Sequence, residues 1–200
     1  MMTTEKKYRM SFTASCLRCR ETSVIASLFL RLADWNKVHD EVLQQNILQI
    51  RTASSQERIF REMKHCLECL TTEEMQILAD NNSSDAGMIL WLAVCRCYKF
   101  IGEFAREVIH EKYVTFQKSI DDSDYALFFE RKCSLHPELM VLKDATRKKI
   151  KQILFKLLRE CAVIGHDNEI LASYFSCEVF RLLSPDDFMY FPTREKGVGR

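Results

Sequence analysis

The chain is 200 residues long, carries a formal net charge of +1 and contains only 5 Gly and 3 Pro. These are 8 of 200 residues, or 4%, against an average usage of about 12%, and residues 1–86 contain neither. The counts exclude a Gly-rich phosphate loop, a dinucleotide fingerprint and Pro-rich or collagen-like segments. They also disfavour a β-rich fold, because tight turns need residues that adopt positive φ. The composition therefore predicts an all-α protein, a compact bundle of several helices.

The hydrophobic share of 47% is enough for one globular body of this length. We expect a flexible segment at residues 1–10, an N-terminal helical region at 11–80, a C-terminal helical region at 81–192 packed with it as one body, and a tail at 193–200. The longest apolar run, residues 86–95, is half the length of about 20 residues that a membrane span needs. The polar N-terminus does not resemble a signal peptide, and nine cysteines are compatible with reduced thiols. These features predict a cytoplasmic protein without a membrane partner.

In the N-terminal half, apolar spacing predicts helices over residues 21–34 and 35–45, with Asp34 as the N-cap of the second. Ser54 and Glu57 match a capping box at the start of a third helix, reached by a short polar connection at residues 51–53. Thr71 and Glu74 match a second capping box, and residues 80–85 (DNNSSD) form the clearest loop.

In the C-terminal half, residues 86–98 predict a central apolar helix, followed by a helix over 100–116 that is broken or kinked near Gly102. Residues 121–124 are an acidic helix start, and Pro137 suits the first turn of a short helix. We expect Asp144 to cap a long helix over 145–162 that ends at Gly165. Short helices over 167–183, an irregular segment over 184–192 and a loose tail follow.

Two helix starts carry the basic and hydroxyl side chains that phosphate groups bind. In both, a short helix, a connection and a longer helix follow one another, which is the order of a helix-turn-helix unit. The first candidate DNA-binding set is Arg51, Thr52, Ser54, Ser55, Arg58 and Arg61; the second is Lys143, Thr146, Arg147, Lys148, Lys149 and Lys151. Residues 143–159 hold seven cationic side chains and one acidic one. The plain alternative is that both faces are simply solvated, and the small net charge argues against indiscriminate binding.

Other chemistry finds little support in the residue pattern. Two C-x-x-C pairs, Cys16 with Cys19 and Cys66 with Cys69, could make a zinc site, but 46 residues separate them, more than the 15–20 of compact zinc ribbons. The five histidines are scattered, and Pro185-Asp186 with Glu195-Lys196 has the wrong spacing for a nuclease. We interpret the Trp and Phe residues as core. We therefore predict no catalytic residues, no metal, no cofactor and no small-molecule substrate.

Several phrases of the sequence resemble the BrxA family, a small core component of bacteriophage exclusion (BREX) defence systems. They lie at residues 11–35 (SFTASCLRCRETSVIASLFLRLADW), 50–61 (IRTASSQERIFR), 89–109 (ILWLAVCRCYKFIGEFAREVI), 136–139 (HPEL) and 146–160 (TRKKIKQILFKLLRE). The likeness extends from about residue 11 to 192.

The resemblance implies an all-helical, non-enzymatic protein that binds double-stranded DNA through helix-turn-helix units and acts with other BREX components. It implies membership of a system that methylates host DNA and blocks phage DNA replication. The family is similar in fold to small helical RNA-binding antitermination factors, which keeps RNA open as a ligand. A second alternative is an adaptor that holds the larger defence methyltransferase or ATPase components together.

Overall fold

The computed structural model describes residues 7–14, 19–80 and 84–194, and every structural statement below refers to these residues. Within them the fold is all-α, as predicted, and no strand longer than an isolated bridge is present. The helices are α1 (Cys19–Leu32), α2 (Trp35–Gln44), α3 (Ala53–Leu67), α4 (Thr72–Asp80), α5 (Ser84–Cys97), α6 (Lys99–Phe104), α7 (Glu111–Val114), α8 (Asp122–Leu135), α9 (Pro137–Met140), α10 (Asp144–Glu160) and α11 (Cys177–Leu182). Two 3₁₀ turns, η1 (Ser11–Ala14) and η3 (Asp187–Tyr190), and a π-helical turn, η2 (Ala105–His110), complete the order.

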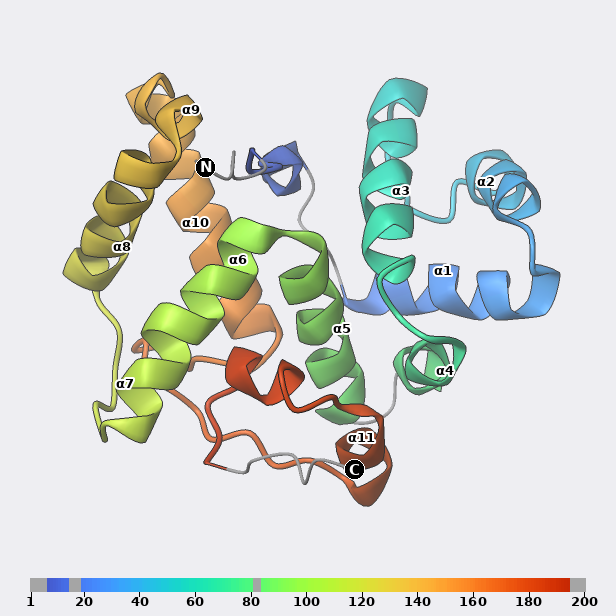
Figure 1. Cartoon of the computed structure of the whole chain (residues 1–200). Coiled ribbons are helices and arrows are strands. Elements are labelled where there is room, and N and C mark those ends of the chain that lie inside the picture. Colours follow the sequence, from blue (N-terminus) through green and yellow to red (C-terminus); the bar gives the residue numbers. More distant parts are fainter. Residues whose placement is uncertain (1–6, 15–18, 81–83, 195–200) are drawn as a thin grey trace, which may run out of the picture.

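Helix α5 is the centre of the molecule, as its apolar sequence predicted. Residues 89–95 are all buried, and α5 packs against α1, α3, α4, α6 and α10. Figure 1 shows α1–α4 on one side of α5 and α6–α10 on the other. Burial of a helix around its whole circumference explains why its sequence is apolar rather than amphipathic.

Four of the predicted helix starts are confirmed. The Asp34 carboxylate accepts the backbone N–H of Asn36 at 2.8 Å. Thr71 and Glu74 form the reciprocal capping box, with bonds of 2.8 and 3.2 Å. Asp121 caps α8 in a box with Asp124, and Pro137 occupies the first turn of α9.

Two other predicted caps are wrong. Helix α3 begins at Ala53 with Thr52 at the N-cap position, and no side chain caps it. The Glu57 carboxylate instead contacts the Nε2 atom of His39 on α2 at 2.5 Å. Likewise Asp144 is the first residue of α10, and Lys143 stands at its N-cap without a capping bond. At Glu57 a tertiary contact with His39 takes the place of the local bond.

The break that we predicted near Gly102 lies three residues later, because α6 continues through Gly102 to Phe104 and the π-helical turn begins at Ala105. Helix α5 ends at Cys97, and α6 starts after Tyr98. A Cβ atom at Gly102 would lie 2.6 Å from the carbonyl oxygen of Cys95, so glycine permits this close turn. The irregular backbone beyond it is the π-helical turn at residues 105–110, where the Nδ1 atom of His110 lies 2.8 Å from the carbonyl oxygen of Phe191.

We expected α10 to end at Gly165, but it ends at Glu160. Ala162 takes a left-handed conformation, with φ of 52°. Its N–H bonds to the Arg159 carbonyl at 3.1 Å, and the Val163 N–H bonds to the Leu158 carbonyl at 2.8 Å. This is a Schellman end in which alanine occupies the place that glycine usually fills.

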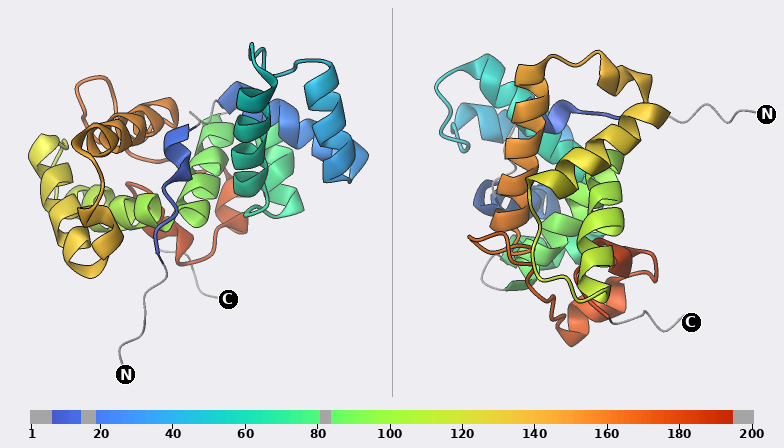
Figure 2. Two further views of the ribbon diagram at one scale, coloured as in Figure 1. Left: turned by 90° about the horizontal axis from the view of Figure 1, so that it is seen from above. Right: turned by 90° about the vertical axis from the view of Figure 1, so that its left-hand side faces the viewer.

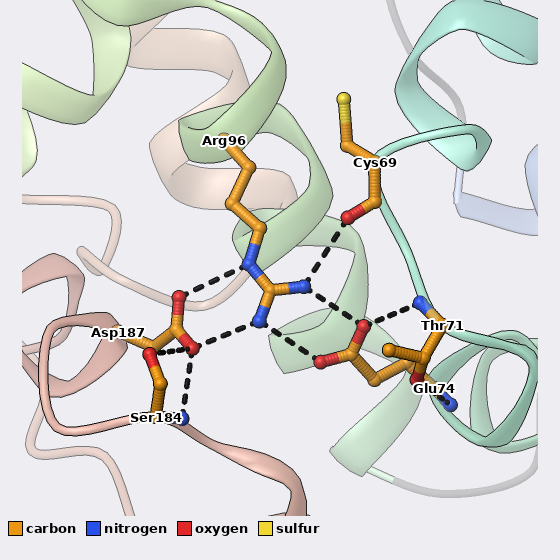
Figure 3. A network of polar contacts seen from close by, with 6 residues as sticks. All are labelled: Cys69, Thr71, Glu74, Arg96, Ser184 and Asp187. Atoms are coloured by element: carbon orange, nitrogen blue, oxygen red, sulfur yellow. Dashed lines mark hydrogen bonds and ion pairs between the residues drawn. The ribbon is translucent and has the colours of Figure 1, made fainter.

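The C-terminal segment, residues 161–194, holds one α-helix, α11, and the 3₁₀ turn η3, joined by turns, isolated bridges and irregular backbone. Arg96 of α5 attaches it to the core, as Figure 3 shows. Its guanidinium donates to Glu74 of α4 at 2.8 and 3.0 Å and to Asp187 of η3 at 3.0 and 2.8 Å. A fifth bond reaches the Cys69 carbonyl at 3.2 Å. One side chain thus joins α4, α5 and the C-terminal segment.

The expectation that all Phe residues are core is wrong at Phe116, which is 72% exposed. The Arg194 guanidinium lies over its ring, with the Cζ atom 3.8 Å from the ring centre. Trp91 is fully buried and Trp35 half-buried. No helix among the described residues is both long enough and apolar enough to cross a membrane.

Candidate nucleic-acid interface

Helix α3 presents the first predicted set on its outer face. Phe60, Met63 and Cys66 are buried against the core, so the opposite face of the helix turns to solvent. Ser54, Arg58 and Arg61 are exposed on that face. Arg51 and Thr52 are also exposed, just before the helix begins, and Ser55 is half-buried. Ser54, Arg58 and Arg61 therefore share the outer face of α3, while Arg51 and Thr52 are exposed just before the helix.

Contacts to α2 fix the direction of α3. The Gln56 Nε2 group donates to the Val42 carbonyl at 2.9 Å, and His39 contacts Glu57. The hydrogen bond with Glu57 raises the pKa of His39, outweighing the opposing effect of burial. The connection between the helices spans residues 45–52, longer than the 51–53 that we expected, and Asn46 and Gln49 in it are left-handed.

The second set, at the start of α10, is divided by the structure. Lys143, Lys148 and Lys149 are exposed. Lys151 is half-buried and forms an ion pair of 2.5 Å with Asp122 of α8. Thr146 is half-buried as well. Three lysines of this set therefore extend into solvent, while Lys151 lies against α8.

Arg147 faces inward rather than outward. Its guanidinium donates to the carbonyls of Leu139, Met140 and Leu142 at 3.3, 2.7 and 3.1 Å. It also lies 5.6 Å from the centre of the Phe129 ring. The side chain thus fastens the turn between α9 and α10 and has few donors left for a ligand.

The two helix starts lie at the same end of the molecule. Figure 1 shows the α9–α10 corner and the start of α3 at the top of the view, and the right-hand view of Figure 2 agrees. The 3₁₀ turn η1 packs against both α3 and α10. The exposed cations of α3 and α10 therefore belong to one end of the fold, with the N-terminal segment between them.

Residues 7–14 form part of this end, although the sequence led us to expect flexibility up to residue 10. Tyr8 is buried, and its N–H donates to Glu138 of α9 at 3.1 Å. Arg9 and Ser11 bond to the buried Glu62 of α3 at 3.0 and 2.7 Å. Tyr98 donates to the same carboxylate at 2.7 Å. No motif in the sequence marks this contact.

The Glu62 carboxylate remains ionised in this setting. Burial acts to raise its pKa, but the hydrogen bonds from Ser11, Tyr98 and Arg9 outweigh burial and lower it. The segment thus contributes Arg9, a cation missed by the pattern analysis, beside the basic face of α3. The polar N-terminus with Lys7 and Arg9 was the only signal available.

Within the described ranges, no group of three or more His, Cys, Asp or Glu side chains is arranged to hold a metal. Cys66 is buried and Cys69 half-buried. Cys16, the Cys19 side chain and the Glu195-Lys196 pair lie outside the described residues. In the Pro185-Asp186 pair, Asp186 is exposed just before η3, and the neighbouring Asp187 accepts a hydrogen bond from Arg96.

Comparison with known proteins places the chain in a family. The family model BrxA matches residues 6–187. A protein of Bacillus cereus named BREX protein BrxA is 22% identical over 82% of each chain. A protein of the same name from Escherichia coli O9:H4 is 22% identical over 82% of this chain and 77% of its own.

A solved structure shares the fold. The crystal structure of an uncharacterized protein from Magnetospirillum magneticum superposes with a TM-score of 0.78 at 20% identity, covering 92% of this chain and 96% of that one. The family match begins before residue 11 and includes the segment that carries Tyr8 and Arg9. Because it extends over most of the sequence, this chain belongs to the BrxA family.

Proposed function

We propose that this protein is a non-enzymatic, double-stranded-DNA-binding component of a BREX phage-defence system. The BREX assignment rests on the curated relatives named BREX protein BrxA. Within the system it acts beside other BREX components.

The observation that carries the DNA proposal is the set of exposed cations at one end of the fold. Arg51 and Arg58 near the start of α3, and Lys143, Lys148 and Lys149 near the start of α10, are all exposed. Phosphate oxygens are strong acceptors for such side chains, and phosphate contacts position a protein on the duplex without reading sequence. The uncapped start of α3 adds backbone N–H groups and the positive end of the helix dipole.

The order of α2, connection and α3 supports a helix-turn-helix mode in which the start of α3 approaches the major groove. In the second unit, α9 and α10 are joined by three residues, 141–143. Arg147 and Lys151 act there as positioning groups, because their side chains already bond to the α9–α10 turn and to Asp122. The contacting members of the second set are then Lys143, Lys148 and Lys149, with Thr146 beside them.

The test is a titration of a fluorescent DNA duplex at two salt concentrations. Each phosphate contact contributes about 0.9 to the slope of log K against log[salt]. The pair Arg58→Ala with Arg61→Ala is therefore expected to reduce that slope by about 2, and Lys148→Glu with Lys149→Glu to weaken binding further. The control is Lys118→Glu with Arg181→Glu, two exposed cations away from both helix starts, which is expected to change little.

The absence of duplex binding at low salt, or equal effects of the control and test pairs, would overturn the proposal. A parallel titration with duplex RNA tests the RNA alternative. Failure to bind DNA, together with co-purification with the methyltransferase or ATPase of the system, would support the adaptor instead.

A further inference from the structure

Two large apolar side chains extend into solvent at the corner between α9 and α10. Met140 is 62% exposed and Val141 is 82% exposed. Turns at such positions are usually polar, with Gly, Asn, Asp or Ser. Figure 1 shows α9 at an outer corner of the molecule, at the same end as the start of α3.

This corner is held rigidly from behind. Leu139 of α9 is fully buried, and Arg147 bonds to three carbonyls of residues 139–142. The buried His136 packs against the Tyr8 ring, with 3.9 Å between ring centres and 33° between the ring planes, so the N-terminal segment supports the other side. The exposed pair is thus presented on a fixed backbone rather than on a loose loop.

The surroundings of the pair are basic. Residues 138–151 contain five cations and two acidic residues. Lys143 and Lys148, which are both exposed, follow Val141 by two and seven positions. A protein partner of ordinary affinity covers about 800 Å² on each side, more than two side chains at an outer corner provide. An apolar tip followed by a basic helix start matches the base stack of DNA, where apolar wedges enter between base steps and cations bind the flanking phosphates.

We propose that Met140 and Val141 form a wedge that inserts between base steps of double-stranded DNA and unwinds it locally. The proposal rests on the DNA-binding function proposed above and adds a residue-level role to it. The lysines near the start of α10 then bind the phosphates on either side of the opened step. Arg147 is the positioning residue that holds the wedge.

The experiment uses the full-length protein bound to a relaxed plasmid, which topoisomerase I closes before the protein is removed. Local unwinding by a wedge leaves a change in linking number. The wild-type protein is expected to produce this change in proportion to bound protein. The Met140→Ser, Val141→Ser variant is expected to bind duplex about tenfold more weakly, since two apolar side chains lose their burial, with the same salt slope and no linking change at saturation.

Two further variants keep the test decisive. Leu127→Ser with Tyr174→Ser removes two equally exposed apolar groups elsewhere, and is expected to behave like wild type. Met140→Leu with Val141→Ile keeps an apolar tip and is expected to retain the linking change. If the serine variant loses duplex binding altogether, the conservative variant decides. Duplex binding by the conservative variant supports the wedge, and loss of duplex binding by that variant overturns the wedge.

The outcomes separate the two proposals. Duplex binding by the wild-type protein without a linking change, or with a change that the serine variant shares, overturns the wedge and leaves the DNA-binding function standing. No duplex binding by the wild-type protein overturns the DNA-binding function itself. In that case, if the serine variant keeps its fold but no longer binds a BREX component that the wild-type protein binds, the α9–α10 corner contacts a protein instead of DNA.

Discussion

Replacement of Arg96 by methionine tests whether the network of Figure 3 attaches the C-terminal segment to the core. Methionine keeps most of the aliphatic length of arginine, so packing changes little. Loss of the guanidinium leaves Glu74 and Asp187, whose side chains are 1% and 6% exposed, without their cation. Removal of one partner of a buried ion pair costs about 3–5 kcal/mol.

The remaining bonds place the expected loss at the lower end of that range. Ser184 still donates to Asp187 through its N–H and hydroxyl, at 2.9 and 2.6 Å. Thr71 still donates to Glu74 at 2.8 Å. We therefore expect a loss of about 3 kcal/mol in the free energy of unfolding at pH 7, measured by urea denaturation. For a chain of this size that corresponds to a fall of roughly 6–12 °C in Tm.

The loss is also expected to depend on pH. Burial acts to raise the pKa of Asp187, but the hydrogen bonds from Arg96 and Ser184 outweigh it and lower the pKa. A carboxylate with a lowered folded-state pKa stabilises the fold above its unfolded pKa, and this contribution disappears as pH falls through the folded value. The gap between wild type and Arg96→Met should therefore narrow below about pH 4.

A second variant separates the cost of losing the Arg96 hydrogen bonds from the cost of burying two unpaired carboxylates. Adding Glu74→Gln and Asp187→Asn to Arg96→Met neutralises both carboxylates, and is expected to recover part of the loss because buried neutral amides cost less than buried charges. The reasoning is refuted if Arg96→Met unfolds within about 1 kcal/mol of wild type, or if the triple variant is no more stable than the single one.

Three further predictions follow from local contacts. Gly102→Ala should cost about 1–3 kcal/mol in urea unfolding, because its Cβ would press on the Cys95 carbonyl at 2.6 Å; an unchanged midpoint would contradict this. The control is Gly87→Ala, whose Cβ would meet nothing nearer than the Cys161 carbonyl oxygen at 4.0 Å. Glu62→Leu should release the N-terminal segment, seen as faster proteolysis near Arg9, because three donors lose their acceptor; an unaltered cleavage rate would count against it. His39 should titrate above its ordinary pKa by NMR and return towards it in Glu57→Gln. Because the pKa of His39 is raised in the folded state, its contribution to stability is complete below the unfolded-state pKa and is lost as the pH rises through the folded-state pKa. The difference in unfolding free energy between wild type and His39→Gln should therefore shrink as the pH rises through the folded-state pKa.

The helical fold was predictable because its signals are local. Asp34, the Thr71–Glu74 box and the Asp121–Asp124 box each satisfy backbone groups within three residues, so sequence spacing alone determines them. The same rule failed at Ser54 and Glu57, where a histidine from α2 competes for the carboxylate. Gly165 failed as a helix end because Ala162, three residues earlier, accepts the left-handed conformation.

The candidate site was predictable as a list of residues but not as a surface. Exposure of Arg58 and Lys148 follows from helical periodicity. The position of the Arg147 side chain does not follow from periodicity. It depends on hydrogen bonds to carbonyl groups of the α9–α10 turn, and the sequence does not determine the geometry of that turn. Nor could the sequence indicate that Arg9 approaches α3, since its partner Glu62 is 53 positions away and lies in no motif.

The scarcity of glycine has a consequence for how the proposed DNA-binding units would dock. A helix-turn-helix turn is usually three or four residues long and often contains glycine. Here the α2–α3 connection spans residues 45–52, and Asn46 and Gln49 supply its left-handed positions. The angle between α2 and α3 is therefore set by the Gln56–Val42 and His39–Glu57 contacts rather than by a tight turn. We expect α3 to approach the duplex at an angle different from that of short-turn units, with phosphate contacts, rather than a standard groove geometry, determining its orientation.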